Sequence, residues 1–501
     1  MWRGRFPREA NDASIHAGME PTNPTHGAQN WIETKIPPRL DRLPWSGWHW
    51  MIVSALGITW VLDGLEVTLA GALAATLKNP VALGLSDTQV GATATAYLSG
   101  AVLGALLFGY LTDRYGRKRL FYITLGVYLC GTALSGFAWN FWSFAAFRAL
   151  TGAGIGGEYA AINSAIDELI PARVRGQVDL AINSTYWLGA ILGSLLTLYL
   201  LNPHIVAPWL GWRLVFGVGA MLGLIILVFR HWVPESPRWL MVHGDPRGAE
   251  QIVDDIESKV QQRYGRLPGP DQTVTRIQVR RHTPWPEIWH TVTRVHGRRS
   301  VLGLVLMSAQ AFFFNAILFS YALVLTKFYS VPAAQVSSYL LPLALGNAIG
   351  PILIGRLFDI IGRKPMISFT YAASGFLLAI SGWLFEKQLL SAQGQALVWC
   401  VIFFIASAAA SSAYLTVSEI FPLEIRAMAI SLFFAVGTLV GGVGAPLLFG
   451  YLISTNSRTN VFLGYLLGSL LMMAAAAVEA GIGVKAERKS LESIATPLSA
   501  R

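Results

Sequence analysis

The stretch Gly109-Tyr-Leu-Thr-Asp-Arg-Tyr-Gly-Arg-Lys118 lies between two long apolar runs and is the clearest indication of the fold. It returns 246 residues later as Gly355-Arg-Leu-Phe-Asp-Ile-Ile-Gly-Arg-Lys364, with the glycines, the acid and the Arg-Lys pair at the same spacing. A second pattern, Glu168-x-x-Pro171-x-x-x-Arg175, returns as Glu419-x-x-Pro422-x-x-x-Arg426. Two signals repeated at nearly the same offset predict a duplicated chain.

The runs around these motifs are strongly apolar. Of the 501 residues, 53% are hydrophobic and only 13% are charged, whereas soluble domains carry about 25% charged residues. So little charge cannot cover a water-facing surface of this size, and this excludes an ordinary soluble enzyme. Charge-free windows such as 88–112, 120–147 and 180–212 exceed the ~20 residues that span a bilayer. Because they show no two-residue alternation, we expect helices and not a barrel.

We therefore predict an all-α integral membrane protein with twelve transmembrane helices in two pseudo-symmetric six-helix bundles, which is a transporter architecture. The predicted spans are 49–77, 88–111, 120–139, 142–166, 178–201, 213–232, 300–326, 335–356, 365–385, 395–418, 427–452 and 461–484. The predicted segments are a disordered tail over 1–47, a six-helix bundle over 48–232, a polar linker over 233–299 with an amphipathic helix near 247–262, a second bundle over 300–484, and a tail over 485–501.

Positive charge in the short loops predicts the orientation. With both termini inside, the inner loops carry ten positive residues, which are Arg114, Arg117, Lys118, Arg119, Arg173, Arg175, Arg356, Arg363, Lys364 and Arg426. The outer loops carry four, which are Lys78, Lys327, Lys387 and Arg458. The positive-inside rule then predicts a multi-pass protein of the cell (inner) membrane with cytoplasmic termini. Anionic lipid headgroups account for much of the +10 net charge, so we expect no nucleic-acid partner.

With these motifs in place, the chain resembles the major facilitator superfamily over about residues 48–484. The fourth-span run 148–158 is similar to the motif of proton-coupled members, and the 234–240 run Pro-Glu-Ser-Pro-Arg-Trp-Leu is similar to the sugar-porter signature. Asp63-Gly64-x-Glu66 resembles the Asp-Gly-x-Asp of aromatic-acid:proton symporters, with Glu in the second place. The resemblance implies a monomeric transporter of a small molecule and protons, with Glu66 in the proton-carrying position.

The chain departs from sugar porters at positions that hold the sugar. The paired glutamines of span seven read Ala309-Gln310, the tyrosines that follow them read Phe319-Ser320, and Tyr414 stands where a tryptophan is frequent. A hexose needs many hydroxyl partners, so these changes favour a smaller or more apolar solute such as a carboxylate.

Two acids in the first span are the leading proton-coupling candidates. Asp63 and Glu66 are three residues apart and share one helix face. A mid-membrane charge costs about 2.5–3.5 kcal/mol on insertion scales, so these carboxyls must be protonated, paired or wetted. Arg148 in span four is the expected partner of Glu66 or of a substrate carboxylate, and Glu158, ten residues on, is a second relay candidate. The alternative is a set of static ion pairs between helices.

We expect the charged loop motifs to form an inner gate, whose ion pairs close when the gate is shut. The alternative is that they only fix topology and loop turns. The gate candidates are Gly109, Asp113, Arg114, Gly116, Arg117, Glu168, Arg175, Asp359, Arg363, Glu419 and Arg426.

Polar and aromatic residues inside the spans are substrate-cavity candidates, although each is also compatible with an ordinary interhelical contact. They are Asn163, Asn183, Tyr186, Trp187, Gln310, Asn315, Asn347 and Tyr414. No His/Cys/Asp cluster has metal-ligand spacing and no catalytic triad is visible, so we expect no enzyme, metal or cofactor.

These features predict a secondary transporter that carries a small organic solute, such as an organic or aromatic acid, in symport with protons by alternating access. The alternatives are a sugar:proton symporter, an exporter or uniporter of the same fold, and a solute sensor that does not transport.

Overall fold

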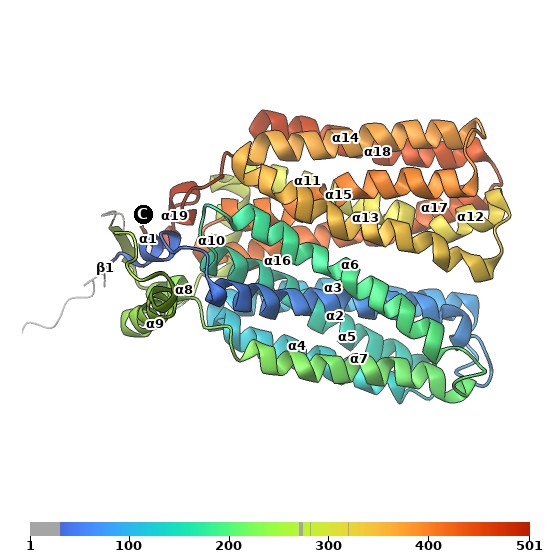
Figure 1. Cartoon of the computed structure of the whole chain (residues 1–501), viewed down its shortest axis with the longest axis horizontal. Helices are drawn as coiled ribbons and strands as arrows, with labels where there is room; N and C mark the ends of the chain where they lie inside the picture. The colour runs from blue at the N-terminus through green and yellow to red at the C-terminus, as the bar shows by residue number, and fades with distance from the viewer. Residues whose placement is uncertain (1–30, 270–273, 281, 319, 501) are drawn as a thin grey trace, which may run out of the picture.

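The computed structural model describes residues 31–269, 274–280, 282–318 and 320–500. Twelve membrane-length helical segments lie side by side in two groups of six (Figure 1). The first group comprises α2 (Gly47–Leu77), α3 (Asp87–Tyr115), α4 (Arg117–Gly136), α5 (Phe141–Leu169), α6 (Arg175–Leu200) and α7 (Pro208–Arg230). The second comprises α11 (Gly297–Leu318) continued by α12 (Tyr321–Tyr329), α13 (Ala333–Ile360), α14 (Arg363–Glu386), α15 (Ala392–Ile420), α16 (Arg426–Gly437) continued by the π-helical η3 (Thr438–Gly444) and α17 (Ala445–Ser454), and α18 (Arg458–Ile482).

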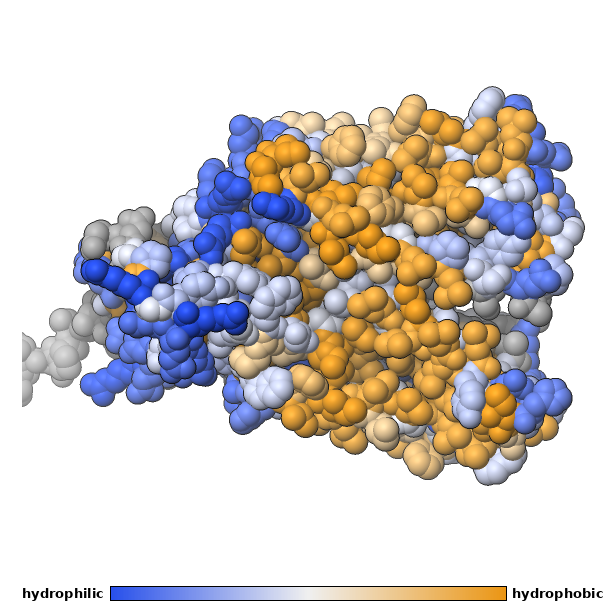
Figure 2. Space-filling view, viewed as in Figure 1, coloured by the Kyte–Doolittle hydropathy of each residue, from blue (hydrophilic) through white to orange (hydrophobic). Residues whose placement is uncertain are grey.

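The predicted twelve-helix fold is confirmed. Within the described ranges, ten helical segments are long and apolar enough to cross a membrane, and α4 and α5 complete the set. These two are less apolar because α4 begins with three basic residues, and α5 carries Arg148, Glu158, Asp167 and Glu168. The four charged side chains of α5 are buried in the protein, so they avoid the cost of facing lipid. Figure 2 shows the resulting apolar surface over the middle of the molecule, with polar residues at both ends.

The same helix pairs pack in each half. α3 packs on α5, α2 on α6 and α4 on α7 in the first half; α13 packs on α15, α11 on α16 and η3, and α14 on α18 in the second. Between the halves, α3 packs against α16 and α6 against α13. A pseudo-twofold axis exchanges these two contacts, because α3 corresponds to α13 and α16 to α6.

Glycines allow several of these helices to approach closely. A Cβ on Gly64 of α2 would overlap the carbonyl of Tyr186 on α6, and a Cβ on Gly152 of α5 would overlap the carbonyl of Tyr97 on α3. Small residues at such crossings are typical of helix packing in membranes.

One end of the bundle carries the segment between the halves, and we call it the linker end (Figure 1). The linker contains α8 (Pro237–Val242), α9 (Pro246–Tyr264), β2 (Thr275–Gln278), α10 (Trp285–His290) and the π-helical η1 (Thr291–Val295). The predicted amphipathic helix is confirmed as α9, which buries Ala249, Val253, Ile256 and Val260 at helical spacing.

The expectation of a disordered tail over 1–47 is wrong for residues 31–46; residues 1–30 lie outside the described part of the chain. Strand β1 (Trp31–Thr34) pairs antiparallel with β2, and α1 (Ile36–Asp41) follows it. The segment folds because its backbone finds a partner strand and because Ile36 and Leu40 are buried in a cluster with α9. Arg39 and Arg42 also pair with Glu257 of α9 at 2.7 and 2.6 Å.

The C-terminal tail returns to the linker end as well. It contains α19 (Leu491–Ile494) and a short 3-10 turn, η4 (Leu498–Ala500). Glu424, in the 3-10 turn η2 (Leu423–Ile425), accepts hydrogen bonds from the N–H groups of Leu498 and Ser499 at 3.1 and 2.9 Å.

Candidate transport site and gate

Two glutamates join the halves at the linker end. Glu168 of α5 accepts hydrogen bonds from Arg117 at 2.8 Å and from Arg426 of the other half at 3.2 Å. Glu419 of α15 binds Arg363 at 2.9 Å and lies 3.7 Å from Arg175 of the first half. All six side chains of this double pattern are nearly inaccessible to solvent.

Each half also caps a helix of the other half. Asp113 of α3 accepts hydrogen bonds from the N–H groups of Ala427 and Met428 in the first turn of α16, at 3.2 and 2.9 Å. Asp359 of α13 accepts from Gly176 and Gln177 in the first turn of α6, at 3.2 and 2.7 Å. A carboxylate at a helix N-terminus satisfies free N–H groups and complements the helix dipole. The halves are therefore bound to one another here, and the molecule is shut at the linker end.

Two of these ion pairs join residues from different copies of the Glu-x-x-Pro-x-x-x-Arg motif. Arg175 and Arg426 do not pair with the glutamate of their own motif; each crosses to the glutamate of the other half. Arg114 is a gate candidate that the structure leaves outside this network, because its exposed guanidinium lies 5.3 Å from the Tyr115 ring. Gly109 lies in the interface, against Ser431 of α16.

Glycines precede the first turns of α4 and α14, and a linker glutamate that the sequence reasoning missed binds the first turn of α4. Gly116 and Gly362 adopt φ of +96° and +118°, which favour glycine. Glu235 of the linker accepts hydrogen bonds from the N–H groups of Arg117 and Lys118, at 2.9 and 3.2 Å. Burial raises the pKa of the Glu235 carboxyl, and these contacts with Arg117 oppose the shift.

The centre of the first half contains two buried ion pairs. Arg148 of α5 donates to Glu66 of α2 and lies over the rings of Tyr97 and Phe216, with 4.7 and 5.7 Å to the ring centroids. Nearer the linker end, Glu158 of α5 accepts from Arg230 at 2.9 Å. Arg230 was missed because a cation at the end of the sixth span is indistinguishable in sequence from a membrane-flanking charge.

Asp63 lies between these two pairs and is 1% exposed. Neither of its carboxyl oxygens has a hydrogen-bond partner among the residues that the structure describes. Its charged neighbours are Glu158, Arg230 and Glu66.

Aromatic rings from both halves meet between these charges and the linker end. Trp60 of α2 contacts Tyr159 of α5 edge to face, with 4.5 Å between the ring centroids. Tyr159 also stacks on Phe434 of α16, with 4.6 Å between the centroids. Tyr414 of α15 stacks on Tyr159 at 5.9 Å. Of these four, only Tyr414 was predicted, because single aromatic residues in apolar helices give no local signal.

A second aromatic group lies between α6 and the second half. The ring centroids of Tyr186 and Trp187 are 5.4 Å apart, and that of Trp187 lies 6.3 Å from the centroid of Phe314 on α11. The Phe314 ring in turn contacts Phe403 of α15, with 4.8 Å between centroids. These rings place the predicted pair Tyr186 and Trp187 at the boundary between the halves.

The predicted asparagines share one geometry. Asn163, Asn183, Asn315 and Asn347 each donate from the amide nitrogen to the backbone carbonyl four residues earlier. The amide oxygens of Asn163 and Asn347 are buried and have no partner within the described ranges, so both can accept a hydrogen bond from a solute. Gln310 is also buried.

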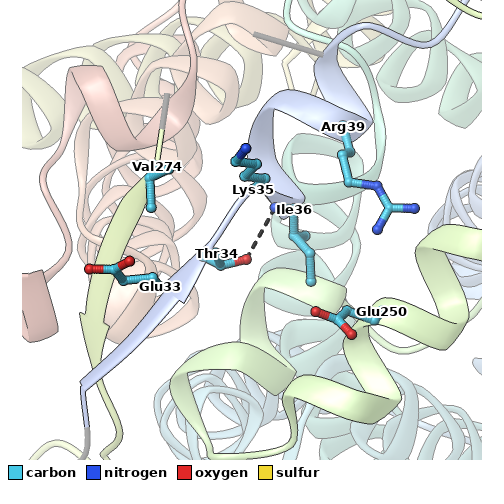
Figure 3. Close-up of a pocket in the computed structure, with 7 residues that line it drawn as sticks. All are labelled: Glu33, Thr34, Lys35, Ile36, Arg39, Glu250 and Val274. Carbon is cyan, nitrogen blue, oxygen red and sulfur yellow. Dashed lines mark hydrogen bonds between the residues drawn. The ribbon is translucent and has the colours of Figure 1, made fainter. Parts of the chain in front are cut away.

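Two hollows among the described residues lie away from this centre. One of about 370 Å³ at the linker end is lined by residues of β1, α1 and α9, including Glu33, Arg39 and Glu250 (Figure 3). Another, of about 470 Å³, lies at the opposite end between α13 and α15, beside Tyr339 and Gln393. No cluster of three metal-ligating side chains occurs in the described part of the chain.

Two six-helix halves around buried charges, closed at one end by reciprocal ion pairs, define a secondary transporter with the major facilitator fold. Residues 39–484 match the family described as "Sugar (and other) transporter". The chain belongs to this family.

Its relatives include transporters of different solutes. The chain is 28% identical to the niacin transporter of Acinetobacter baylyi over 91% of this chain and 98% of that protein. It is 25% identical to the gallate transporter of Pseudomonas putida over 82% of this chain and 90% of that one. The solved structure of the proton:xylose symporter XylE, bound to 6-bromo-6-deoxy-D-glucose, matches with a TM-score of 0.72 at 20% identity, over 89% of this chain and 98% of that one.

Proposed function

We propose that this protein is a proton-coupled symporter of a small organic acid. The observation that carries the proposal is the buried pair of Glu66 and Arg148 at the centre of the first half. A lone carboxylate in this position would be costly, and Arg148 removes that cost while Glu66 is ionised. When Glu66 takes up a proton, Arg148 is released and can bind an anionic solute with a bidentate fork.

This exchange of partners couples the movement of the proton to that of the solute. The proton neutralises Glu66, and the solute carboxylate replaces it as the partner of Arg148. Either load alone leaves a buried charge unpaired, which opposes the conformational change, whereas both together leave the cluster balanced.

The shut linker end supports alternating access. We assign the linker end and both termini to the cytoplasm of the inner membrane, because the short loops at this end carry the excess of Lys and Arg. A monomer contains both halves and therefore both sides of the gate.

Two relatives favour an acid as the solute. Niacin and gallate, named for the relatives above, are both aromatic carboxylic acids. Arg148 can bind such a carboxylate, and the rings of Trp60, Tyr159 and Tyr414 offer stacking surfaces for the aromatic part. A sugar:proton symporter is the second candidate, favoured by the likeness to XylE and by a D-xylose transporter from Levilactobacillus brevis at 24% identity.

The available driving force is sufficient for accumulation. A membrane potential of 100 mV supplies about 2.3 kcal/mol per charge, and one pH unit supplies about 1.4 kcal/mol. Together these sustain an accumulation of roughly 500-fold for one proton with an uncharged load. An anionic load moves no net charge with one proton, so the pH gradient alone then drives it to about tenfold.

The test measures uptake of labelled nicotinate, gallate and xylose by proteoliposomes under an imposed pH gradient. We expect uphill uptake of an acid that collapses when the gradient is dissipated. Glu66→Gln should abolish uphill uptake and retain exchange of solute across the membrane. Glu479→Gln is the matched control, because Glu479 is an equally buried acid on α18, outside the central cluster.

The other outcomes assign the other functions. Uphill uptake of xylose alone would identify a sugar symporter, and flux that ignores the gradient would identify a uniporter. Efflux driven by the gradient would identify an exporter. Ligand-induced thermal stabilisation with no flux would identify a sensor.

A further inference from the structure

The second ion pair, Glu158 with Arg230, stands one helical turn from an acid that has no partner. One nitrogen of Arg230 donates both to Glu158 at 2.9 Å and to the hydroxyl of Thr59 at 3.2 Å. Thr59 is four residues before Asp63 on α2, so the guanidinium lies about 6 Å along the helix axis from the level of Asp63.

The charges of this centre do not balance. Asp63, Glu66 and Glu158 are three acids, while Arg148 and Arg230 are two cations, and all five side chains are at most 3% exposed. Among the described residues, the other titratable groups that interact electrostatically with Asp63 are Tyr97 of α3, Tyr128 of α4, Tyr159 of α5 and Tyr186 of α6, and none of these four is a cation. An unpaired buried carboxylate costs several kcal/mol, so one proton resides in the cluster.

We infer that Asp63 holds this proton in this state. Glu66 is paired with Arg148, and Glu158 is paired with Arg230. Both oxygens of Asp63 lack a partner among the described residues, which is the geometry that suits a neutral carboxylic acid better than an anion.

Arg230 retains the donors needed for a second partner. Its Nε and second terminal nitrogen make no hydrogen bond to the described part of the chain. Its guanidinium rests over the Phe121 ring at 4.6 Å, a surface on which a planar cation can slide. A rotamer change can therefore carry it from the level of Thr59 to Asp63.

We propose that Arg230 exchanges between Glu158 and Asp63, and that the proton of Asp63 is transferred to Glu158 in the same step. Before the step Asp63 is a neutral acid and Glu158 is ionised on Arg230. After it Asp63 is ionised on Arg230 and Glu158 is the neutral acid. The O–H bond of Asp63 breaks, an O–H bond forms on Glu158, and the charge of the cluster is unchanged.

The exchange gives the proton a direction. α2 begins at the linker end, and Glu158 shares a donor with Thr59, so Glu158 lies one turn nearer that end than Asp63. Glu66 lies on the other side of Asp63 along α2. The order Glu66, Asp63, Glu158 is a path towards the linker end, and Arg230 is a positioning residue on it. This inference rests on the proposed proton coupling.

A static strut between α5 and α7 is the competing interpretation, and a double variant separates the two. Glu158→Gln with Arg230→Met removes both charges together, which is often neutral for stability when a buried pair is replaced. If the pair is only a strut, the double variant should transport like the parent protein.

The experiment compares the parent protein, Asp63→Asn, the double variant and Arg230→Lys in proteoliposomes, with the acid that the parent accumulates. We expect Asp63→Asn and the double variant to lose the gradient-driven accumulation, about tenfold for a gradient of one pH unit, while solute counterflow persists and becomes independent of pH. Arg230→Lys keeps a cation at this position, so it should retain part of the pH dependence of transport that the double variant loses. The thermal midpoint of each variant verifies folding.

Accumulation and pH dependence equal to those of the parent, in either Asp63→Asn or the folded double variant, would overturn the relay. If the parent itself shows no gradient-driven accumulation, the proposed function fails first. Loss in the double variant with a normal Asp63→Asn would also overturn it, because the proton would then not pass through Asp63.

Discussion

Replacing Glu168 with glutamine should open the linker end. Glu168 accepts from Arg117 of its own half and from Arg426 of the other half, at 2.8 and 3.2 Å. Of these two contacts only the one with Arg426 joins Glu168 to the other half, so it is the contact that biases the gate. A hydrogen bond to a charged group contributes about 1.5–3 kcal/mol. Its loss should move the equilibrium towards the open state by about 10- to 150-fold.

Cysteine accessibility measures this shift directly. Ser431 is 1% exposed and faces Gly109 across the interface, so Ser431→Cys should react with a charged maleimide only when the halves part. The two native cysteines, Cys130 and Cys400, are replaced first. We expect Glu168→Gln to accelerate labelling from the linker side in proportion to the open population.

The control is Glu386→Gln, which neutralises an acid 3.4 Å from Lys387, away from the gate. An unchanged labelling rate in folded Glu168→Gln would refute the gate assignment. Glu419→Gln should give the same effect to a smaller extent, because its contact across the halves with Arg175 is longer, at 3.7 Å.

Two further predictions concern stability. Gly116→Ala forces a Cβ into a backbone conformation with φ of +96° and against Glu235, so thermal unfolding should report a loss of about 1–3 kcal/mol, whereas Gly217→Ala, a helical site with open space around it, should show no loss. Burial lowers the pKa of His243 to about 4, so the unfolded chain binds this proton first as the pH falls. Stability should therefore decline from about pH 6.5 towards pH 4, and His243→Gln should remove this part of the decline; an identical slope in both proteins would contradict it.

The sequence was sufficient for the fold and for most of the charged side chains that meet at the linker end. Long charge-free runs leave few alternatives in a bilayer, and two repeated motifs place Glu168 and Glu419 at matching helix ends. The sequence does not identify the partners of these glutamates. Arg426 lies 258 residues from Glu168 along the chain, and only the packing of the halves brings them together.

Only part of the candidate site was predicted, and the missing part has a similar cause. Acids in apolar spans are conspicuous, so Asp63, Glu66 and Glu158 were found. Arg230 resembled a flanking charge, and the rings of Trp60, Tyr159 and Phe434 resembled ordinary apolar residues. The strand Trp31–Thr34 has only four residues, and its pairing with residues 275–278 depends on a fold that closes over more than two hundred positions.

The crossed contacts at the linker end have a consequence for the origin of the molecule. Asp113 reaches the first turn of α16 just as Asp359 reaches the first turn of α6, so each of these two contacts is a copy of the other with the halves exchanged. Contacts of this kind are what an isologous dimer makes about its twofold axis. A single ancestral chain of six helices would have satisfied both sets by pairing with itself. Fusion of two such copies through a linker would leave each copy free to diverge, and the buried acids Asp63, Glu66 and Glu158 lie in the first half.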